Sequence, residues 1–236
     1  MFKNEETPLK KSDLTRRKLF DIAIGMFAKE GFEQTTMRAI AQKAGIAPGG
    51  IYYHYDTKES LIHEYYQRSH DEHLERLGDF LGTEKDFAKR LHRVVASKIE
   101  VAEPYKNMSR ALFRVAANPD SELSPFSRTS KRLRLESMKI FKEVVDGSQA
   151  SFLPELKSVL PAYLWLYQMG IILYWIFDKS EGSKKTFEFI DRTVPLIEML
   201  NQTLSSALAI PFRGKVVAIL KSFTPDLGDP LTKEPV

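Results

Sequence analysis

One short stretch of the sequence, from Thr36 to Lys58, constrains the fold more than any other: TMRAIAQKAGIAPGGIYYHYDTK. Its first part repeats apolar residues at the spacing of one buried helical face, namely Met37, Ile40, Ala41 and Ala44. The hydroxyl of Thr35 or Thr36 can cap the start of this helix, and Gly45 can supply the positive φ that ends it. The pattern predicts two short helices joined by a tight turn, an arrangement that can enter the major groove of DNA.

The second short helix is expected over residues 47–53, where Pro48 suits the first turn. Its apolar anchor points are Ile46, Ile51, Tyr52 and Tyr55. Gly49 and Gly50 each weaken a helix by roughly 1 kcal/mol relative to alanine, and a helix this short is not stable alone. We therefore expect neighbouring helices, or DNA itself, to order this segment.

The run from Arg16 to Ile62 resembles the DNA-binding domain of the TetR/AcrR family of transcriptional regulators. The matching landmarks are Phe20, Ala23, Phe27, Gly31, Ile40, Ala41, Ala44, Gly45, Tyr52, Tyr55, Lys58 and Leu61. They extend over about a fifth of the chain. The resemblance implies a dimeric regulator, most often a repressor, that binds a palindromic operator and leaves it when a small molecule binds.

The resemblance also indicates which residues would face DNA: Thr36, Arg38, Ala47, Pro48, Gly49, Tyr52, Tyr53, His54 and Lys58. The start of the first short helix favours a phosphate, Arg38 suits a guanine edge, and Lys58 would bring its charge to the DNA backbone. Ala47 and Gly50 stand where the family often has polar residues, so sequence reading would also depend on DNA shape. A solvated surface is the plainer alternative for Arg38, and for Tyr52 and Tyr55 a core position is favoured over a DNA contact.

The composition is that of an ordinary soluble protein, with 43% apolar and 28% charged residues among 236. The absence of cysteine excludes disulfides, thiolate metal sites and a cysteine nucleophile. The net charge of +4 does not by itself indicate a nucleic-acid partner, but a basic cluster that can follow a phosphate backbone lies near the first long helix: Lys10, Lys11, Arg16, Arg17 and Lys18. Residues 1–13 contain no apolar segment, so we expect no signal peptide and a cytoplasmic protein.

The sequence predicts an all-α fold. We expect a mobile N-terminal arm at residues 1–11 and a three-helix helix-turn-helix DNA-binding domain at 12–60. A larger helical domain for ligand binding and dimerisation is expected at 61–224, and a C-terminal tail at 225–236. No alternating strand pattern of useful length is present in the sequence. Helices are expected at about 14–30, 36–44, 47–53, 58–77, 85–102, 104–116, 124–145, 154–178, 183–209 and 212–223.

Residues 161–177 are uncharged over a length at the lower limit for a membrane span. Asp178 and Lys179 end this run abruptly, so we interpret it as a buried helix and expect no membrane partner. In the family that the chain resembles, the last two long helices of each subunit form a four-helix bundle across a two-fold axis. The corresponding helices here are 154–178 and 183–209, and Pro195 should kink or break the second.

The resemblance further implies a small-molecule pocket in the larger domain, where aromatic residues are frequent. The candidate ligand contacts are Arg110, Phe113, Arg114, Tyr163, Tyr167, Gln168 and Tyr174. The two arginines and Gln168 each interrupt an apolar stretch, although surface pairing is the plainer alternative for the arginines. The expected effector is apolar or aromatic, with an acidic group as a further option, and its identity does not follow from the sequence.

Polar residues repeat along one side of the helix expected at 58–77: His63, Gln67, His70 and His73. A metal site is conceivable there, but a solvated polar face is the favoured interpretation, and no metal or cofactor is expected. The sequence has no Glu-x-x-His pair, G-x-S-x-G turn, phosphate-binding loop or H-E-x-x-H motif, so an enzyme is disfavoured and no catalytic residue is assigned. The remaining alternative is a DNA-binding structural or adaptor protein without a ligand pocket.

Overall fold

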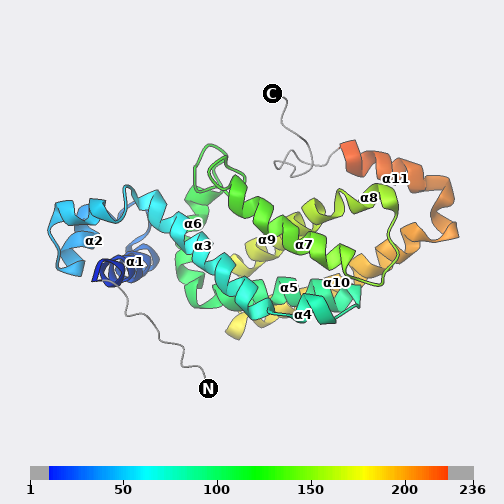
Figure 1. The fold of residues 1–236 in the computed structure, drawn as a ribbon, viewed down its shortest axis with the longest axis horizontal. Coiled ribbons are helices and arrows are strands. Elements are labelled where there is room, and N and C mark those ends of the chain that lie inside the picture. Colours follow the sequence, from blue (N-terminus) through cyan, green and yellow to red (C-terminus); the bar gives the residue numbers. More distant parts are fainter. Residues whose placement is uncertain (1–10, 223–236) are drawn as a thin grey trace, which may run out of the picture.

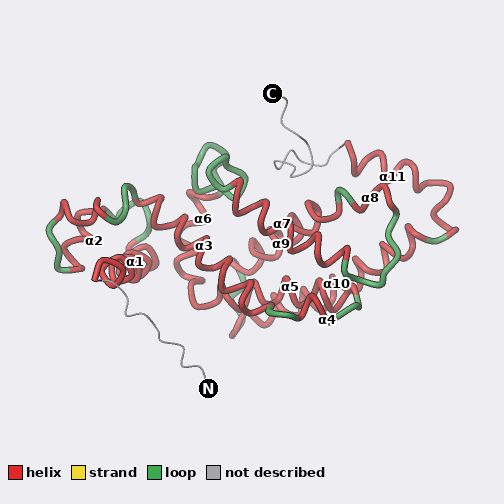
Figure 2. The backbone as a smooth tube through the Cα atoms, in the orientation of Figure 1, coloured by secondary structure: helices red, strands yellow, loops and turns green. Residues whose placement is uncertain are grey.

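The computed structural model describes residues 11–222, and within that range the chain consists of helices joined by turns (Figures 1 and 2). The α-helices are α1 (Lys11–Glu30), α2 (Met37–Ala44), α3 (Lys58–Leu77), α4 (Phe80–Thr83), α5 (Phe87–Ala102), α6 (Lys106–Ala116), α7 (Lys131–Asp146), α8 (Pro154–Lys157), α9 (Leu160–Phe177), α10 (Lys184–Ser205) and α11 (Ile210–Ser222). Short 3₁₀ helices lie at Pro48–Tyr53, Glu103–Tyr105, Glu181–Ser183 and Ala207–Ala209. The predicted all-α fold is confirmed.

The molecule is elongated, with α1 and α2 at one end and the packed helices α5, α7, α9 and α10 toward the other (Figure 1). We call α1, α2, Pro48–Tyr53 and the first half of α3 the head. The head lies around one hydrophobic core, to which α3 contributes Leu61, Ile62 and Tyr65 and α6 contributes Met108 and Leu112. The far end of α3 adds Leu77 to the second core, which the larger domain forms. Helix α3 therefore takes part in both cores, and the predicted boundary after residue 60 falls inside it.

Most predicted helices occur within a few residues of the expected bounds, and two differ for a physical reason. The helix expected at 124–145 begins only at Lys131, because serine hydroxyls hold the preceding residues in turns. The Oγ atoms of Ser121, Ser124 and Ser127 accept from the amides of Leu123 (3.2 Å), Phe126 (3.3 Å) and Ser130 (3.1 Å). The helix expected at 154–178 is divided into α8 and α9, and Pro161 lies in the first turn of α9.

Helix α10 continues through Pro195 from Lys184 to Ser205, so Pro195 does not break the helix, and a kink there stays a prediction. Pro195 and Asp191 are both exposed, and water can satisfy the Asp191 carbonyl that loses its intrahelical donor. Lys10, the rest of the predicted arm before Lys11, and the predicted tail at 225–236 lie outside the described residues.

Helix α9 is the single helix within residues 11–222 that is long and apolar enough to cross a membrane. The segments Glu181–Ser205 and Ala207–Ser222 would give a second candidate only as one broken span, and they are bent by 73°. One face of α9 is buried in the core of the larger domain through Leu164, Trp165, Ile171, Trp175 and Ile176. This packing is typical of a core helix.

A buried arginine joins three segments of the larger domain. Arg90 is 1% exposed, and its guanidinium donates to the main-chain carbonyls of Leu81 (2.5 Å), Glu143 (2.5 Å), Val144 (3.0 Å) and Glu84. A Cβ atom added at Gly147 would lie 2.2 Å from Nη2 of Arg90 and 3.1 Å from the Glu143 carbonyl oxygen. Because these hydrogen bonds fix the guanidinium, the arginine cannot move aside without losing some of them.

We expect Gly147→Ala to lower the free energy of unfolding by about 1–3 kcal/mol, the usual cost of forcing atoms into a packed site. Gly25→Ala is the matched control, since Gly25 lies within α1 and an added Cβ there meets nothing within 4 Å. That control should instead stabilise the protein by roughly 0.5–1 kcal/mol. Urea unfolding followed by circular dichroism measures both variants, and equal stability of the two would contradict the Arg90 explanation.

Candidate nucleic-acid interface

Helix α2 begins and ends as the sequence predicts. The hydroxyl oxygen of Thr36 accepts from the amide of Ala39 (3.1 Å), while the buried Thr35 donates to the carbonyl of Gly31 (2.8 Å). Thr36 is therefore the capping residue. Gly45 ends the helix with a φ of 73°, and the amide of Ile46 returns to the carbonyl of Ala41 (3.1 Å). The cap and the tight turn are both confirmed.

The short helix expected at 47–53 is present as a 3₁₀ helix, Pro48–Tyr53, which we call the recognition segment. It has no side-chain cap at its start, and Gly49 and Gly50 are poor helix formers. Ile51, buried in the head core, anchors the segment together with Tyr55 just beyond it. Neighbouring helices thus order this segment in the structure without DNA.

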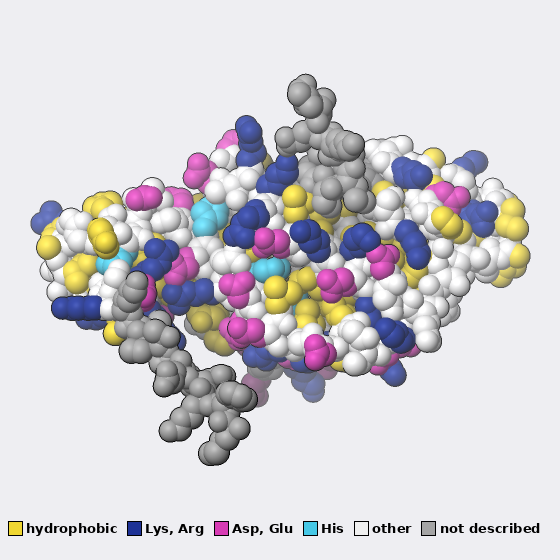
Figure 3. Space-filling model, viewed as in Figure 1, with side chains coloured by type: hydrophobic (Ala, Val, Ile, Leu, Met, Phe, Trp, Pro, Cys, Tyr) yellow, Lys and Arg dark blue, Asp and Glu magenta, His cyan; other side chains and the backbone are white. Residues whose placement is uncertain are grey.

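The tyrosines of the segment point to different environments. Tyr55 is 2% exposed and belongs to the head core, as expected. Tyr52 is 55% exposed and Tyr53 is 83% exposed, so the core position favoured for Tyr52 is wrong. In Figure 3, exposed hydrophobic side chains gather at the end of the molecule that carries the head. Solvent exposure leaves both tyrosines available to a partner.

The remaining candidates for DNA contact are also accessible. Those exposed are Thr36, Arg38, Ala47, Pro48 and Gly49, whereas His54 and Lys58 are half-buried. Thr36 and Arg38 lie at the start of α2, and Ala47, Pro48 and Gly49 lie at the start of the recognition segment. The proposed contacts therefore occupy the beginnings of two neighbouring helical elements, where backbone amides without intrahelical partners favour anions.

Several cations expected to follow a phosphate backbone are turned toward the protein instead. The ammonium of Lys58 donates to the carbonyl of Phe32 (2.9 Å) and lies 4.6 Å from its ring centroid. The ammonium of Lys18 donates to the carbonyl of Ala44 (2.8 Å) at the end of α2. These lysines donate to main-chain carbonyls within the head, so a phosphate contact by Lys58 or Lys18 stays a prediction.

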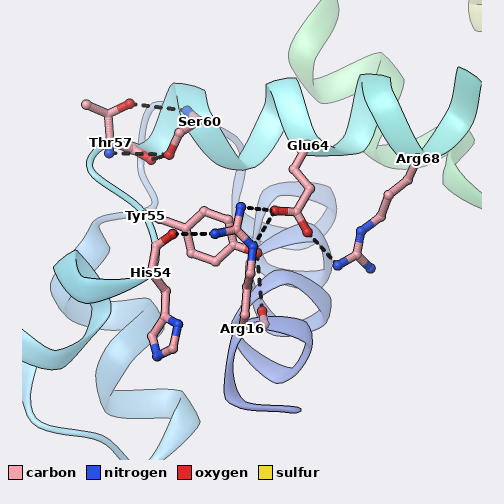
Figure 4. A network of polar contacts seen from close by, with 7 residues as sticks. All are labelled: Arg16, His54, Tyr55, Thr57, Ser60, Glu64 and Arg68. Atoms are coloured by element: carbon pink, nitrogen blue, oxygen red, sulfur yellow. Dashed lines mark hydrogen bonds and ion pairs between the residues drawn. The ribbon is translucent and has the colours of Figure 1, made fainter. Parts of the chain in front are cut away.

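Arg16 is the centre of a larger polar network (Figure 4). Its guanidinium donates to the carbonyl of His54 (2.9 Å) and, through Nε and Nη2, to one carboxylate oxygen of Glu64 (3.0 and 2.5 Å). The other oxygen of Glu64 accepts from Arg68 (2.5 Å). Burial alone would raise the pKa of the Glu64 carboxyl, but hydrogen bonds from Arg16 and Arg68 hold it below its usual range. Glu64 is therefore ionised at neutral pH.

Two of the polar residues expected on a solvated face of α3, His70 and His73, are instead buried, whereas His63 and Gln67 are half-buried. His70 and His73 are buried because α5 and α7 pack against this side of α3. Nε2 of His73 lies 2.9 Å from the carbonyl oxygen of Val94 and 3.1 Å from Oγ of Ser97. Burial lowers the pKa of His73 to about 3, which keeps its imidazole neutral. Within residues 11–222, no group of three or more His, Asp or Glu side chains is arranged to hold a metal ion.

The larger domain carries an open apolar groove of about 750 Å³, lined by Phe113, Tyr167, Gly170, Ile171, Leu173, Tyr174, Phe177 and Phe189. Three candidate ligand residues, Phe113, Tyr167 and Tyr174, contribute to it. The other candidates, Arg110, Arg114, Tyr163 and Gln168, are not part of its lining.

The hydrogen bonds of two of these other candidates connect elements of the protein itself. Arg110 donates to the carbonyl of Ile176 at the end of α9 (3.1 and 3.2 Å), and Tyr163 donates to the carbonyl of Leu220 (2.7 Å). Gln168 is buried, and its Oε1 atom accepts no hydrogen bond. Ligand binding by any of these residues stays a prediction.

Comparison with known families gives two matches. Residues 90–209 match the family model described as the tetracyclin repressor-like C-terminal domain. Residues 19–65 match the model of bacterial regulatory proteins of the tetR family. The first match covers just over half of the chain, and the second contains α2 and the recognition segment.

Relatives and solved structures agree with these matches. The transcriptional repressor KstR2 of Rhodococcus jostii is 33% identical over 88 residues, which are 37% of this chain and 43% of that protein. KstR2 of Mycolicibacterium smegmatis is 28% identical over 143 residues, 60% of this chain and 69% of that protein. The chain thus matches less than half the length of the Rhodococcus relative.

Two solved structures have the same fold. The TetR transcriptional regulator of Nitrosomonas europaea superposes with a TM-score of 0.59 at 17% identity, covering 78% of this chain and 98% of that one. A tetR-family regulator of Streptomyces coelicolor gives a TM-score of 0.58 at 16% identity and covers 92% of both chains. The likeness therefore extends through the head and the larger domain.

We expect Tyr53→Ala to lower affinity for a specific DNA site by about tenfold, the loss of one contact of about 1.4 kcal/mol. Its thermal unfolding should be unchanged, because the side chain is exposed. Tyr55→Ala is the contrasting variant and should destabilise the head by about 3 kcal/mol or more, since it removes a buried ring. Fluorescence anisotropy with labelled DNA and thermal unfolding measure the two effects. Unaltered DNA affinity in Tyr53→Ala would remove Tyr53 from the interface.

Proposed function

Because the chain belongs to the TetR family of bacterial regulatory proteins, we propose that it is a dimeric DNA-binding transcriptional regulator that represses from a palindromic operator. The observation that carries the proposal is the capped helix α2 followed by an exposed recognition segment anchored through Ile51 and Tyr55. The KstR2 relatives are named transcriptional repressors, which supports repression over activation. Such a regulator would act in the cytoplasm, where the DNA is.

Reading of the operator would combine few base contacts with DNA shape. The recognition segment offers the rings of Tyr52 and Tyr53, while Ala47, Pro48 and Gly49 offer only small apolar or main-chain surfaces. Arg38, exposed at the start of α2, is the side chain best suited to a guanine edge. Phosphate contacts by main-chain amides would set the position of the head, and deformability of the DNA would add specificity.

The proposed dimer surface is the apolar face of α9 and α10. Exposed large apolar side chains on these helices are Leu173, Tyr174, Phe177, Phe189, Leu196, Met199 and Leu200. Their positions on α10 follow helical spacing, so they form one stripe. Leu208 and Ile210, beyond the end of α10, are further exposed apolar side chains. Hydrophobic side chains are also visible at the end of the molecule away from the head (Figure 3). A surface of this extent on a soluble chain supports pairing with a second copy.

An apolar or aromatic effector would suit the groove between α6, α9 and α10. Its walls include the edge-to-face pair Phe113–Phe177, with ring centroids 5.4 Å apart, and the tilted pair Tyr174–Phe189 at 5.0 Å. The effector would cause release from DNA only if it binds more tightly to a subunit arrangement in which the distance between the two heads does not match the operator half-sites.

A second candidate function is DNA-binding regulation without an effector. The observation that favours it is the overlap of the groove with the proposed dimer surface, because Leu173, Tyr174, Phe177 and Phe189 belong to both. Side chains of a second copy could then fill the groove. Binding of aromatic compounds to the intact dimer, measured by calorimetry, distinguishes the two functions.

Selection from a random double-stranded DNA library, with purified protein at physiological salt, tests the proposal directly. We expect an enriched palindrome with half-sites about one helical turn apart, which is the spacing that a two-fold dimer requires. The selected site then allows candidate effectors to be screened for release. Weak, salt-sensitive binding to all sequences would contradict a specific operator.

We expect Leu200→Arg to convert the dimer into monomers and to abolish cooperative operator binding, because it places a charge in the proposed apolar interface. Leu200 is 59% exposed, so the subunit fold should be unaffected. Leu74→Arg is the matched control, because Leu74 is an exposed leucine on α3, outside the proposed surface. Analytical ultracentrifugation gives the mass of each variant. A Leu200→Arg dimer as stable as that of the control would place the interface elsewhere.

A further inference from the structure

The recognition segment does not hold its own position. It is a six-residue 3₁₀ helix with two glycines and no side-chain cap at its start. A helix of this length gains too little from its own hydrogen bonds to be rigid. Ile51 fixes its middle in the head core, so the orientation of its far end depends on contacts made after Tyr53.

Those contacts are made by Arg16 of α1. Its Nη1 atom donates to the carbonyl of His54, the residue that follows the recognition segment (2.9 Å). The guanidinium also lies 4.5 Å from the ring centroid of Tyr55, and the Tyr55 hydroxyl donates to the carbonyl of Arg16 (3.2 Å). Arg16 therefore contacts both residues that follow the segment: the main-chain carbonyl of His54 and the side chain of Tyr55.

Glu64 of α3 sets the direction of that guanidinium. One carboxylate oxygen accepts from both Nε and Nη2 of Arg16, which leaves Nη1 directed at the His54 carbonyl (Figure 4). The other oxygen accepts from Arg68, whose guanidinium lies 3.9 Å from the ring centroid of Phe20. Both oxygens of Glu64 are occupied, and its side chain is only 14% exposed.

Glu64 is a negatively charged residue in the part of the protein that is proposed to bind DNA. A carboxylate in a DNA-binding head repels phosphates, so electrostatics alone would favour its removal. We propose that Glu64 is a positioning residue for operator recognition, which orients Arg16 so that the end of the recognition segment is fixed to α3. This inference rests on the proposed function. It adds the residues that connect the recognition segment to α3, the helix shared by the two domains.

The other half of α3 is tied to the larger domain by a separate set of bonds. His73 contacts the carbonyl of Val94, Arg76 pairs with Glu100 (3.2 Å), and Lys98 donates to Oγ of Ser69 (2.9 Å). A displacement of α3 caused in the larger domain would therefore reach the recognition segment through Glu64 and Arg16. The contacts of Glu64 and Arg16 thus offer a route by which an effector could alter recognition of DNA.

The test compares Glu64→Gln with wild type on the selected operator and on random duplex DNA. Glutamine keeps the shape but loses the charge that orients Arg16. We expect operator affinity to fall by about tenfold or more, as when one partner of a hydrogen-bonded charge pair is removed. Affinity for random DNA should be unchanged or higher, because one repulsive charge is gone. Glu59→Gln, the same change five residues earlier in α3, is the matched control and should lose no operator affinity.

A second variant separates positioning from folding. Arg16→Lys keeps the positive charge but loses the planar fork that reaches His54 and Glu64 together. It should reproduce the selective loss of operator affinity, and combining it with Glu64→Gln should cost no more than either change alone. Thermal unfolding is recorded for every variant, so that a variant in which the head is unfolded is recognised.

The outcomes are distinct. A wild-type protein that enriches no sequence overturns the proposed function, and this inference with it. An operator that Glu64→Gln and Arg16→Lys bind as tightly as wild type overturns the inference alone. The third outcome is an equal loss of binding to operator and to random DNA, with a lower unfolding temperature in both variants. It would show that the Arg16–Glu64 network only stabilises the fold, and it would overturn the inference.

Discussion

The packing of α3 into two separate hydrophobic cores is the constraint on which the arrangement of this molecule depends. Leu61 and Ile62 are fully buried in the head, and Leu77 is buried in the larger domain. A helix held at both ends can move only if both cores adjust, because packed interiors do not deform gradually. Helix α6 adds to this connection, because Met108 and Leu112 are buried in the head core, so the head is joined to the larger domain by packed helices and not by a linker.

The sequence was informative wherever the cause of a structure is local. The cap at Thr36 and the turn at Gly45 depend on residues a few positions apart, so their pattern can be read directly. The roles of Arg16, Lys18 and Lys58 depend on carbonyls 26 to 38 residues away, and nothing in the sequence marks those acceptors. A basic residue near a DNA-binding motif is therefore predicted to contact phosphate, whereas in the structure these basic residues donate to carbonyls of the protein.

The same distinction explains the other differences. Polarity predicted that the histidine side of α3 faces water, whereas tertiary packing buries His70 and His73 against α5 and α7. The serines at 121–130 form side-chain bonds to nearby amides that compete with a helix, a preference that apolar spacing does not reveal. Among the candidate ligand residues, aromatic character identified part of the groove lining, but the hydrogen-bond partners of Arg110 and Tyr163 required the fold.

The buried guanidinium of Arg90 also constrains how this chain can diverge. Its donors hold carbonyls from α4, the following loop and α7, and the hydrogen atom at Gly147 is the only substituent that leaves room for it. A larger residue becomes acceptable at position 147 only after the arginine has gone, and loss of the arginine leaves four carbonyls without that donor. The two positions should therefore vary together among relatives, with arginine at one accompanied by glycine at the other.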